Sequence, residues 1–99
     1  MAGKVSVRIS CDPEIVLQRR SKGRRNERWL WNVELYIDHG RGKTKKSIPE
    51  GEVGEVSKAE GREGAIAAAH RALEAICLRH GVVTPPLDKC EIIDEDTLL

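Results

Sequence analysis

Ten basic side chains, gathered in two short segments, are the clearest chemical signal in this sequence. Residues 19–28 have no hydrophobic period and are mostly charged, and residues 41–46 cover the end of a predicted glycine-rich turn over 38–43 and the start of the next strand. A guanidinium group can hydrogen-bond two oxygens of one phosphate, and basic groups bound along a nucleic acid release its counterions. These side chains are therefore the candidate binding site for an anionic partner. They are Arg19, Arg20, Lys22, Arg24, Arg25, Arg28, Arg41, Lys43, Lys45 and Lys46.

The charge of the chain is divided along its length. Residues 1–46 contain twelve Lys or Arg against five Asp or Glu, a net charge of +7, whereas residues 47–99 contain five against eleven, a net charge of −6. This polarity favours a basic face with an anionic partner, or two oppositely charged faces that serve different contacts. The alternative is a solvated surface on which folding interleaves the two halves.

Two histidines and two cysteines are the residue types that bind zinc. His70, Cys77 and His80 fall on one side of a predicted helix, and Cys90 follows a proline-rich connector. A structural zinc site needs four such ligands at tetrahedral distance, and this spacing matches no zinc-finger pattern. A buried neutral cysteine and a histidine at the helix end explain these residues better, so we expect neither a bound metal nor a cofactor.

No catalytic motif is present. Glu50, Glu52 and Glu55 form a cluster of carboxylates, but the glycines between them are typical of a solvated loop. A nucleophile, a base and an orienting group normally leave a local signature, and none of the usual ones occurs. The sequence therefore predicts a protein without enzymatic activity.

Cysteine usage and the absence of long apolar runs indicate a cytoplasmic protein. The three cysteines, one of them Cys11, are an odd number at irregular spacing, which favours reduced thiols. No apolar run approaches about 18 residues, and residues 1–5 contain no apolar signal segment. We expect no association with a membrane.

The binding residues must be positioned by strands around Trp29–Ile37. Apolar residues occupy every second position there, which predicts a central strand with one buried face. Residues 4–10 alternate in the same way and predict a first strand. Residues 14–18 predict a second strand, with one helical turn after Asp12-Pro13 as the alternative. Residues 44–48 predict a shorter edge strand, and residues 49–56 a loop.

A single long helix is predicted over Ser57–His80. Ser57 and Glu60 have the spacing of a capping box, and Gly81 suits the C-terminal cap. Because glycines weaken the first turns, the alternative is a helix that begins near Glu63. An apolar stripe at helical spacing should pack on the sheet. Its members are Ile66, Ala69, Leu73, Ile76, Cys77 and His80.

These elements together predict one α+β domain over residues 1–93, followed by an acidic tail over 94–99. Its sheet would be small and antiparallel, with three to five strands and one long C-terminal helix packed on one face. Residues 89–93 are an optional edge strand. In this arrangement the two basic segments project from opposite ends of the central strand.

The order of elements from Trp31 to Ile76 resembles the C-terminal half of a double-stranded-RNA-binding domain. The matching residues are Ser57-Lys58 and the alanine-rich stretch from Ala67 through Leu73. In that family, lysines at the start of the helix contact phosphates across a groove. The resemblance implies an RNA contact at Lys58, because it is the one lysine here that matches the family's lysines at the start of the helix.

The same half is also similar to small phage and prophage accessory proteins, which place a Trp-containing hairpin before an alanine-rich helix. Some of these, the anti-CRISPR proteins, block a host defence complex by surface contact without catalysis. Two functions are therefore expected. In the first, the domain binds nucleic acid or a nucleoprotein through its basic hairpin arm. In the alternative, it is an inhibitor or adaptor of a host protein complex.

Overall fold

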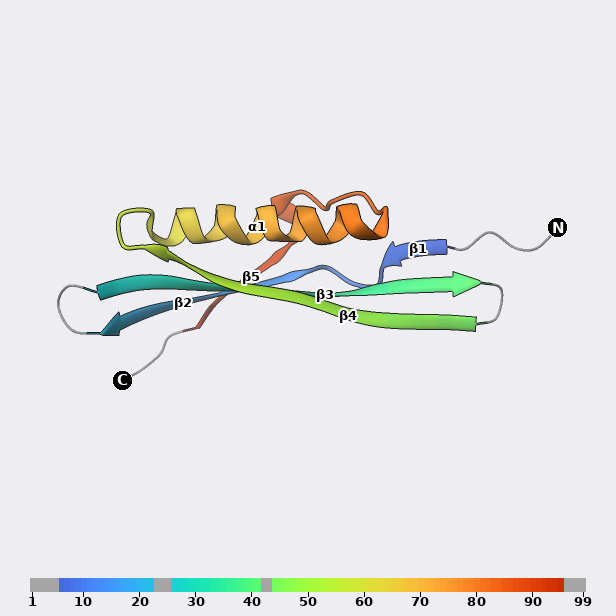
Figure 1. The fold of residues 1–99 in the computed structure, drawn as a ribbon, viewed down its shortest axis with the longest axis horizontal. Coiled ribbons are helices and arrows are strands. Elements are labelled where there is room, and N and C mark those ends of the chain that lie inside the picture. The colour runs from blue at the N-terminus through green and yellow to red at the C-terminus, as the bar shows by residue number, and fades with distance from the viewer. Residues whose placement is uncertain (1–5, 23–25, 42–43, 96–99) are drawn as a thin grey trace.

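The fold is that of a computed structural model, which describes residues 6–22, 26–41 and 44–95 (Figure 1). It is an α+β arrangement of five strands and one long helix, as expected. The elements are β1 (Ser6–Ile9), β2 (Glu14–Lys22), β3 (Asn26–Arg41), β4 (Thr44–Ser57), α1 (Gly61–His80), a 3-10 turn (Leu87–Lys89) and β5 (Glu91–Glu95).

The sheet is built around β3, which contains the alternating segment Trp29–Ile37. Strand β4 pairs antiparallel with β3 from Arg28 to Arg41. Strand β2 pairs with the first half of β3 and β1 with the second half, both antiparallel. Because β4 already takes one edge of β3, β1 and β2 must lie end to end along the other edge. The predicted strand over residues 14–18 is confirmed, and it extends to Lys22.

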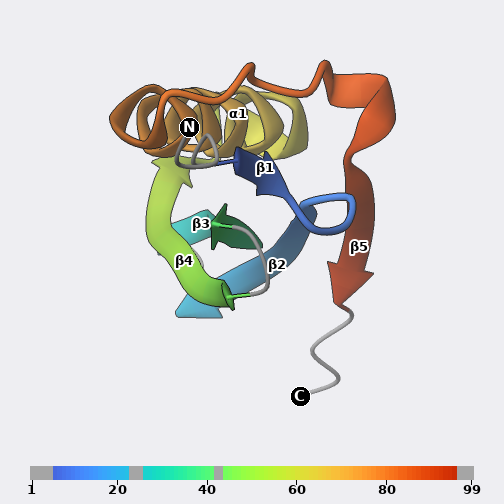
Figure 2. The same ribbon diagram turned by 90° about the vertical axis from the view of Figure 1, so that its right-hand side faces the viewer.

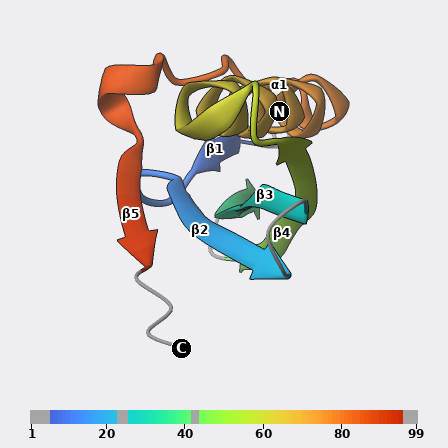
Figure 3. The same cartoon turned by 90° about the vertical axis from the view of Figure 1, so that its left-hand side faces the viewer.

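The sheet is mixed, so the expectation of a purely antiparallel sheet was wrong. Strand β5 pairs parallel with β2, with Ile15 opposite Ile92. The reason lies in the connection through α1. The helix carries the chain from β4 across β3 and β2 to the opposite flank, and β5 then runs in the same direction as β4. Figures 2 and 3 both show β4 and β5 at opposite flanks beneath the helix.

Helix α1 covers one face of this sheet and closes the core. Side chains that alternate along β2 and β3 are fully buried against it, among them Leu17, Val33 and Ile37. The helix contributes Leu73 and Ile76 from the predicted stripe. Trp29 and Trp31 are only partly buried and pack against the rim of this core. Burial of these aliphatic side chains is the main stabilising contribution of the fold.

The helix begins at Gly61, four residues later than predicted. Ser57 is the last residue of β4 instead. The capping-box contacts do form, because the Ser57 amide donates to Glu60 Oε2 at 3.3 Å and the Glu60 amide donates to Ser57 Oγ at 3.4 Å. They stabilise the turn before the helix, and Gly61 enters the helix with φ of +63°, a conformation that favours glycine.

Residues 49–56 are part of β4, so the predicted loop there was also wrong. Glycines and glutamates disfavour a strand locally, but pairing along all of β3 overrides that preference. Gly54 has a specific role in this pairing, because it lies opposite Trp31. A Cβ at position 54 would come within 2.3 Å of Trp31 Cζ2. The missing side chain makes room for the indole ring.

The molecule is elongated, with principal extents of 63 × 22 × 19 Å. The β2–β3 and β3–β4 hairpins extend in opposite directions along the long axis (Figure 1). Strand β5 continues through Asp94 and Glu95, two residues into the segment predicted as an acidic tail. Within the described residues, no helix is both long and apolar enough to cross a membrane.

Candidate functional site: the open face of the sheet

The described residues of the two basic segments lie at opposite ends of the molecule, as expected from the strand order (Figure 1). Arg19 pairs with Glu27 at 3.3 Å, and Arg28 lies 3.8 Å from Glu55. Arg20 and Lys46 are exposed. Lys22, Arg41 and Lys45 have described backbones on strands, and their side chains lie outside the described part. Arg24, Arg25 and Lys43 lie outside the described residues.

The basic side chains do not gather into one patch. Arg19 and Arg20 are neighbours on β2, so their side chains leave opposite faces of the sheet. Arg20 stands opposite Arg28 on the face away from the helix. Lys46 stands opposite His39 on the helix-covered face, at the other end of the molecule. The arginine side chains of both salt bridges are at least half exposed, so these pairs hold the arginines only weakly.

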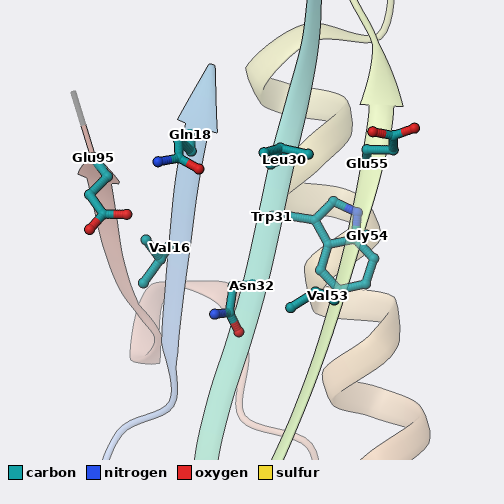
Figure 4. Close-up of a pocket in the computed structure, with 9 residues that line it drawn as sticks. All are labelled: Val16, Gln18, Leu30, Trp31, Asn32, Val53, Gly54, Glu55 and Glu95. Atoms are coloured by element: carbon teal, nitrogen blue, oxygen red, sulfur yellow. The ribbon is translucent and has the colours of Figure 1, made fainter. Parts of the chain in front are cut away.

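The face of the sheet opposite α1 is covered by none of the described elements, and it is hollowed. We call it the open face. A depression with a volume of about 430 Å³ lies over its middle (Figure 4). Strands β2, β3, β4 and β5 all contribute to its lining. The lining residues are Val16, Gln18, Leu30, Trp31, Asn32, Val53, Gly54, Glu55 and Glu95.

A second depression of about 470 Å³ continues the first along β3 and β4. The two share Asn32 and Val53, so we treat them as one groove. The second part reaches Tyr36 and Pro49. Val53 is 72% exposed and Tyr36 50% exposed, and both lie along the same groove. The groove therefore presents apolar surface to solvent.

Carboxylates surround this groove. Glu14 stands opposite Glu34 on one side and Glu91 on the other, so three adjacent strands place a glutamate in one row. Glu55 and Glu95 line the groove itself. No cation pairs closely with Glu14, Glu34, Glu91 or Glu95 among the described residues. The middle of the open face is thus acidic, although all the residues predicted to bind a partner are basic.

A chain of three polar side chains connects α1 to β3 and β4 on the covered face. His80 Nε2 donates to Glu50 Oε2 at 2.5 Å, and His80 Nδ1 lies 3.1 Å from His39 Nε2. In the neutral form of His80 the Nδ1 atom accepts, so His39 donates the second hydrogen bond. His80 lies in the last turn of α1, where the helix dipole favours positive charge. Arg79 also approaches Glu50, at 4.0 Å.

The four candidate metal ligands have separate partners. His70 Nε2 hydrogen-bonds the carbonyl oxygen of Pro85 at 2.9 Å, and His80 belongs to the chain just described. Burial raises the pKa of both Cys77 and Cys90, which keeps these thiols protonated. In the described part of the chain, no three His, Cys, Asp or Glu side chains are arranged to hold a metal ion.

A bidentate ion pair fixes β5 to the helix. Arg62 Nε and Nη2 donate to the two carboxylate oxygens of Asp94 at 2.8 and 2.7 Å. These hydrogen bonds hold the pKa of Asp94 below its usual range. Because Asp94 points toward α1, its neighbours Ile93 and Glu95 point toward the open face.

The groove was not predicted from the sequence, because the lining residues of any one strand form no recognisable motif. Its signal is the presence of apolar residues, such as Val16 and Leu30, at alternate positions that were expected to be polar because they face away from the core. Only the cross-strand register brings them together with Val53. Comparison of the chain with protein-family models, with curated proteins and with solved structures found no match in any of the three.

Proposed function

We propose that this protein is a non-enzymatic binding domain that holds a protein partner in the groove of its open face. The partner contributes an exposed segment that combines apolar and basic side chains. The observation that carries the proposal is the apolar groove bordered by carboxylates. Such a domain acts as an adaptor or inhibitor by surface contact, in the manner of a phage-type inhibitor of a host complex.

Hydrophobic burial supplies the affinity in this proposal. Leu30, Val53 and Tyr36 expose apolar atoms that a partner would cover, at roughly 25 cal/mol for each Å² removed from water. An aromatic or aliphatic anchor in a groove of this size is typical of the centre of a protein interface. Helix α1 packs on the other face of the sheet and completes the core there. The open face is therefore available to a partner.

Charge supplies the specificity. Glu14, Glu34 and Glu91 form a row of like charges beside the groove, and a row of this kind costs stability in the free protein. A basic partner removes that repulsion and gains complementary charge, which raises the association rate at low salt. A phosphate backbone would meet the same carboxylates as a repulsive surface. The open face therefore favours a protein over a nucleic acid.

The second candidate function is nucleic-acid binding through the β2–β3 hairpin. It is favoured by one observation, the adjacent position of Arg20 and Arg28 on exposed strands at that end. If four phosphates are neutralised, a plot of log affinity for a DNA duplex against log salt concentration should have a slope of about −3.6. Absence of duplex binding even at about 50 mM salt would exclude this candidate.

A pair of matched variants tests the protein-binding function. Val53 and Val83 are both exposed valines, but only Val53 lies in the groove. Affinity capture from the native host would use wild type, Val53→Lys and Val83→Lys, each with nuclease present. The proposal expects a partner that survives nuclease, binds Val83→Lys as it binds wild type, and is lost with Val53→Lys. A partner retained by Val53→Lys, or released by nuclease, would contradict it.

A further inference from the structure

Strand β4 is the exposed edge of the sheet on the side of the groove. It pairs with β3 along its length, and no described element pairs with its outer edge. An edge strand of this kind presents unpaired backbone N–H and C=O groups to solvent. These groups can accept a further strand from another chain.

The two halves of β4 differ in how this edge is protected. The first half contains Lys45, Lys46 and Pro49. Lysines and proline on an edge strand both discourage pairing with other chains, and proline has no N–H to donate. The second half, residues 50–57, contains neither lysine nor proline. Apart from Ser57, whose amide and carbonyl groups bond to Glu60, its backbone is open to a partner strand.

The unprotected half is also the half that borders the groove. Val53, Gly54 and Glu55 line the first depression, and Gly51 lies in the adjoining one. Two glycines in four residues leave little side chain between solvent and the backbone of this edge. The exposed side chains here are Glu52, Val53 and Glu55, so the edge is acidic and apolar in the same way as the groove.

We infer that the partner segment binds as an added β-strand along residues 50–57 of β4. This inference rests on the proposed protein-binding function and specifies how the partner is held. Backbone hydrogen bonds to the β4 edge fix the register of the segment. Its apolar side chains then lie toward the groove at Val53 and Leu30, and its basic side chains alternate with them and meet Glu52, which points to the other face of β4. Eight residues of strand correspond to about 26 Å of pairing length.

A synthetic peptide of alternating lysine and valine, seven residues long with blocked ends, is the probe. It has the apolar and basic character of the inferred segment and a strong preference for extended structure. The matched control is the same peptide with every internal amide N-methylated, which retains the side chains and the charge but removes the backbone donors. A glutamate–valine peptide controls for charge.

Binding is measured by titration of the intact protein, with amide hydrogen exchange as the second readout. We expect the parent peptide to bind, the N-methylated peptide to bind at least about tenfold more weakly, and the glutamate peptide not to bind. Amides within residues 50–57 should become protected from exchange only with the parent peptide. Val53→Lys should weaken binding, and Val83→Lys should not.

Two outcomes would overturn the inference in distinguishable ways. If the N-methylated peptide binds as tightly as the parent and the β4 amides gain no protection, the groove holds its partner through side chains alone. The strand addition is then wrong and the proposed function stands. If neither peptide binds and capture from the host is also insensitive to Val53→Lys, both the strand addition and the proposed function are wrong.

Discussion

The two faces of the sheet come from the same strands yet have opposite characters. The covered face holds a continuous aliphatic layer against α1, including Leu17, Val33 and Leu35. The open face holds apolar residues separated by amides and carboxylates, such as Leu30 beside Asn32 and Glu34. Alternation along each strand creates this division, since consecutive side chains point to opposite faces.

This difference separates stability from recognition. A buried aliphatic layer stabilises the fold but exposes no surface to which a partner could bind. The open face contributes little to the core, and so it can carry like charges and exposed apolar groups that a stable core would exclude. If stability and recognition are divided in this way, substitutions on the covered face should lower the free energy of unfolding far more than substitutions on the open face.

Consecutive residues on β3 give the sharpest test of this division. Leu35 is buried against the helix, whereas Tyr36 is half exposed on the open face. Leu35→Ala should lower the free energy of unfolding by about 2–5 kcal/mol, because it leaves a cavity in the core. Tyr36→Ala should cost less than about 1 kcal/mol. Urea denaturation measures both, and equal losses would show that the open face also belongs to the core.

The contact between Trp31 and Gly54 lies where the two faces meet at the β4 edge. Gly54→Ala should destabilise the protein by about 1–3 kcal/mol, because the added Cβ collides with the indole ring. Trp31→Ala should itself cost about 2 kcal/mol, less than for a fully buried tryptophan. In the double variant the collision is gone, so the two losses should not add. Strict additivity in denaturation would contradict the contact.

The hydrogen-bonded side chains of His39, His80 and Glu50 on the covered face should contribute less to the free energy of unfolding than the aliphatic core. His80→Ala removes the hydrogen bonds to Glu50 and His39, so we expect a loss of about 1–2 kcal/mol in the free energy of unfolding. The cycle with Glu50→Gln should show a coupling free energy of about 1 kcal/mol. Independent effects of the two substitutions would mean that the helix end is held by packing alone.

The smallest effect should come from the ion pair between Arg62 and Asp94. The folded-state pKa of Asp94 lies below its usual value, so this stabilisation is present above about pH 4 and is lost as the pH falls through the folded-state pKa. Its magnitude should be about 0.5 kcal/mol, because both side chains are about half exposed. Asp94→Asn should remove that pH dependence from urea denaturation, and Asp88→Asn, on an exposed residue of the 3-10 turn, should not. An unshifted Asp94 titration by NMR would contradict the prediction.

Local patterns in the sequence were sufficient for most elements. The alternation over Trp29–Ile37 predicted the central strand, and the stripe through Leu73 and Ile76 predicted the buried side of the helix. The capping-box spacing predicted the contacts of Ser57 and Glu60, although these precede the helix. Residues 49–56 were misread because their propensities favour a loop, and only pairing with β3 makes them a strand.

The candidate site was less predictable than the fold. Sequence reasoning selected dense positive charge, which is visible in a single segment, and placed its two groups at opposite ends. The groove needs Val16 from β2, Leu30 from β3 and Val53 from β4, which are far apart in the chain. The row of glutamates likewise depends on β5 pairing with β2. Strand pairing partners are set by long-range packing, and no local pattern encodes them.

By itself, the sequence determined the α+β class, the central strand, the long helix and the opposite placement of the basic segments. These depend on periodicity and turn residues, which act over a few positions. Only the tertiary structure decided the parallel pairing of β5, the strand character of residues 49–56 and the acidic groove. The strand character of residues 49–56 comes from pairing with β3. The parallel pairing of β5 and its glutamates in the groove depend on α1, which carries the chain across the sheet. That crossing brings side chains distant in the sequence onto one face and leaves the opposite face open.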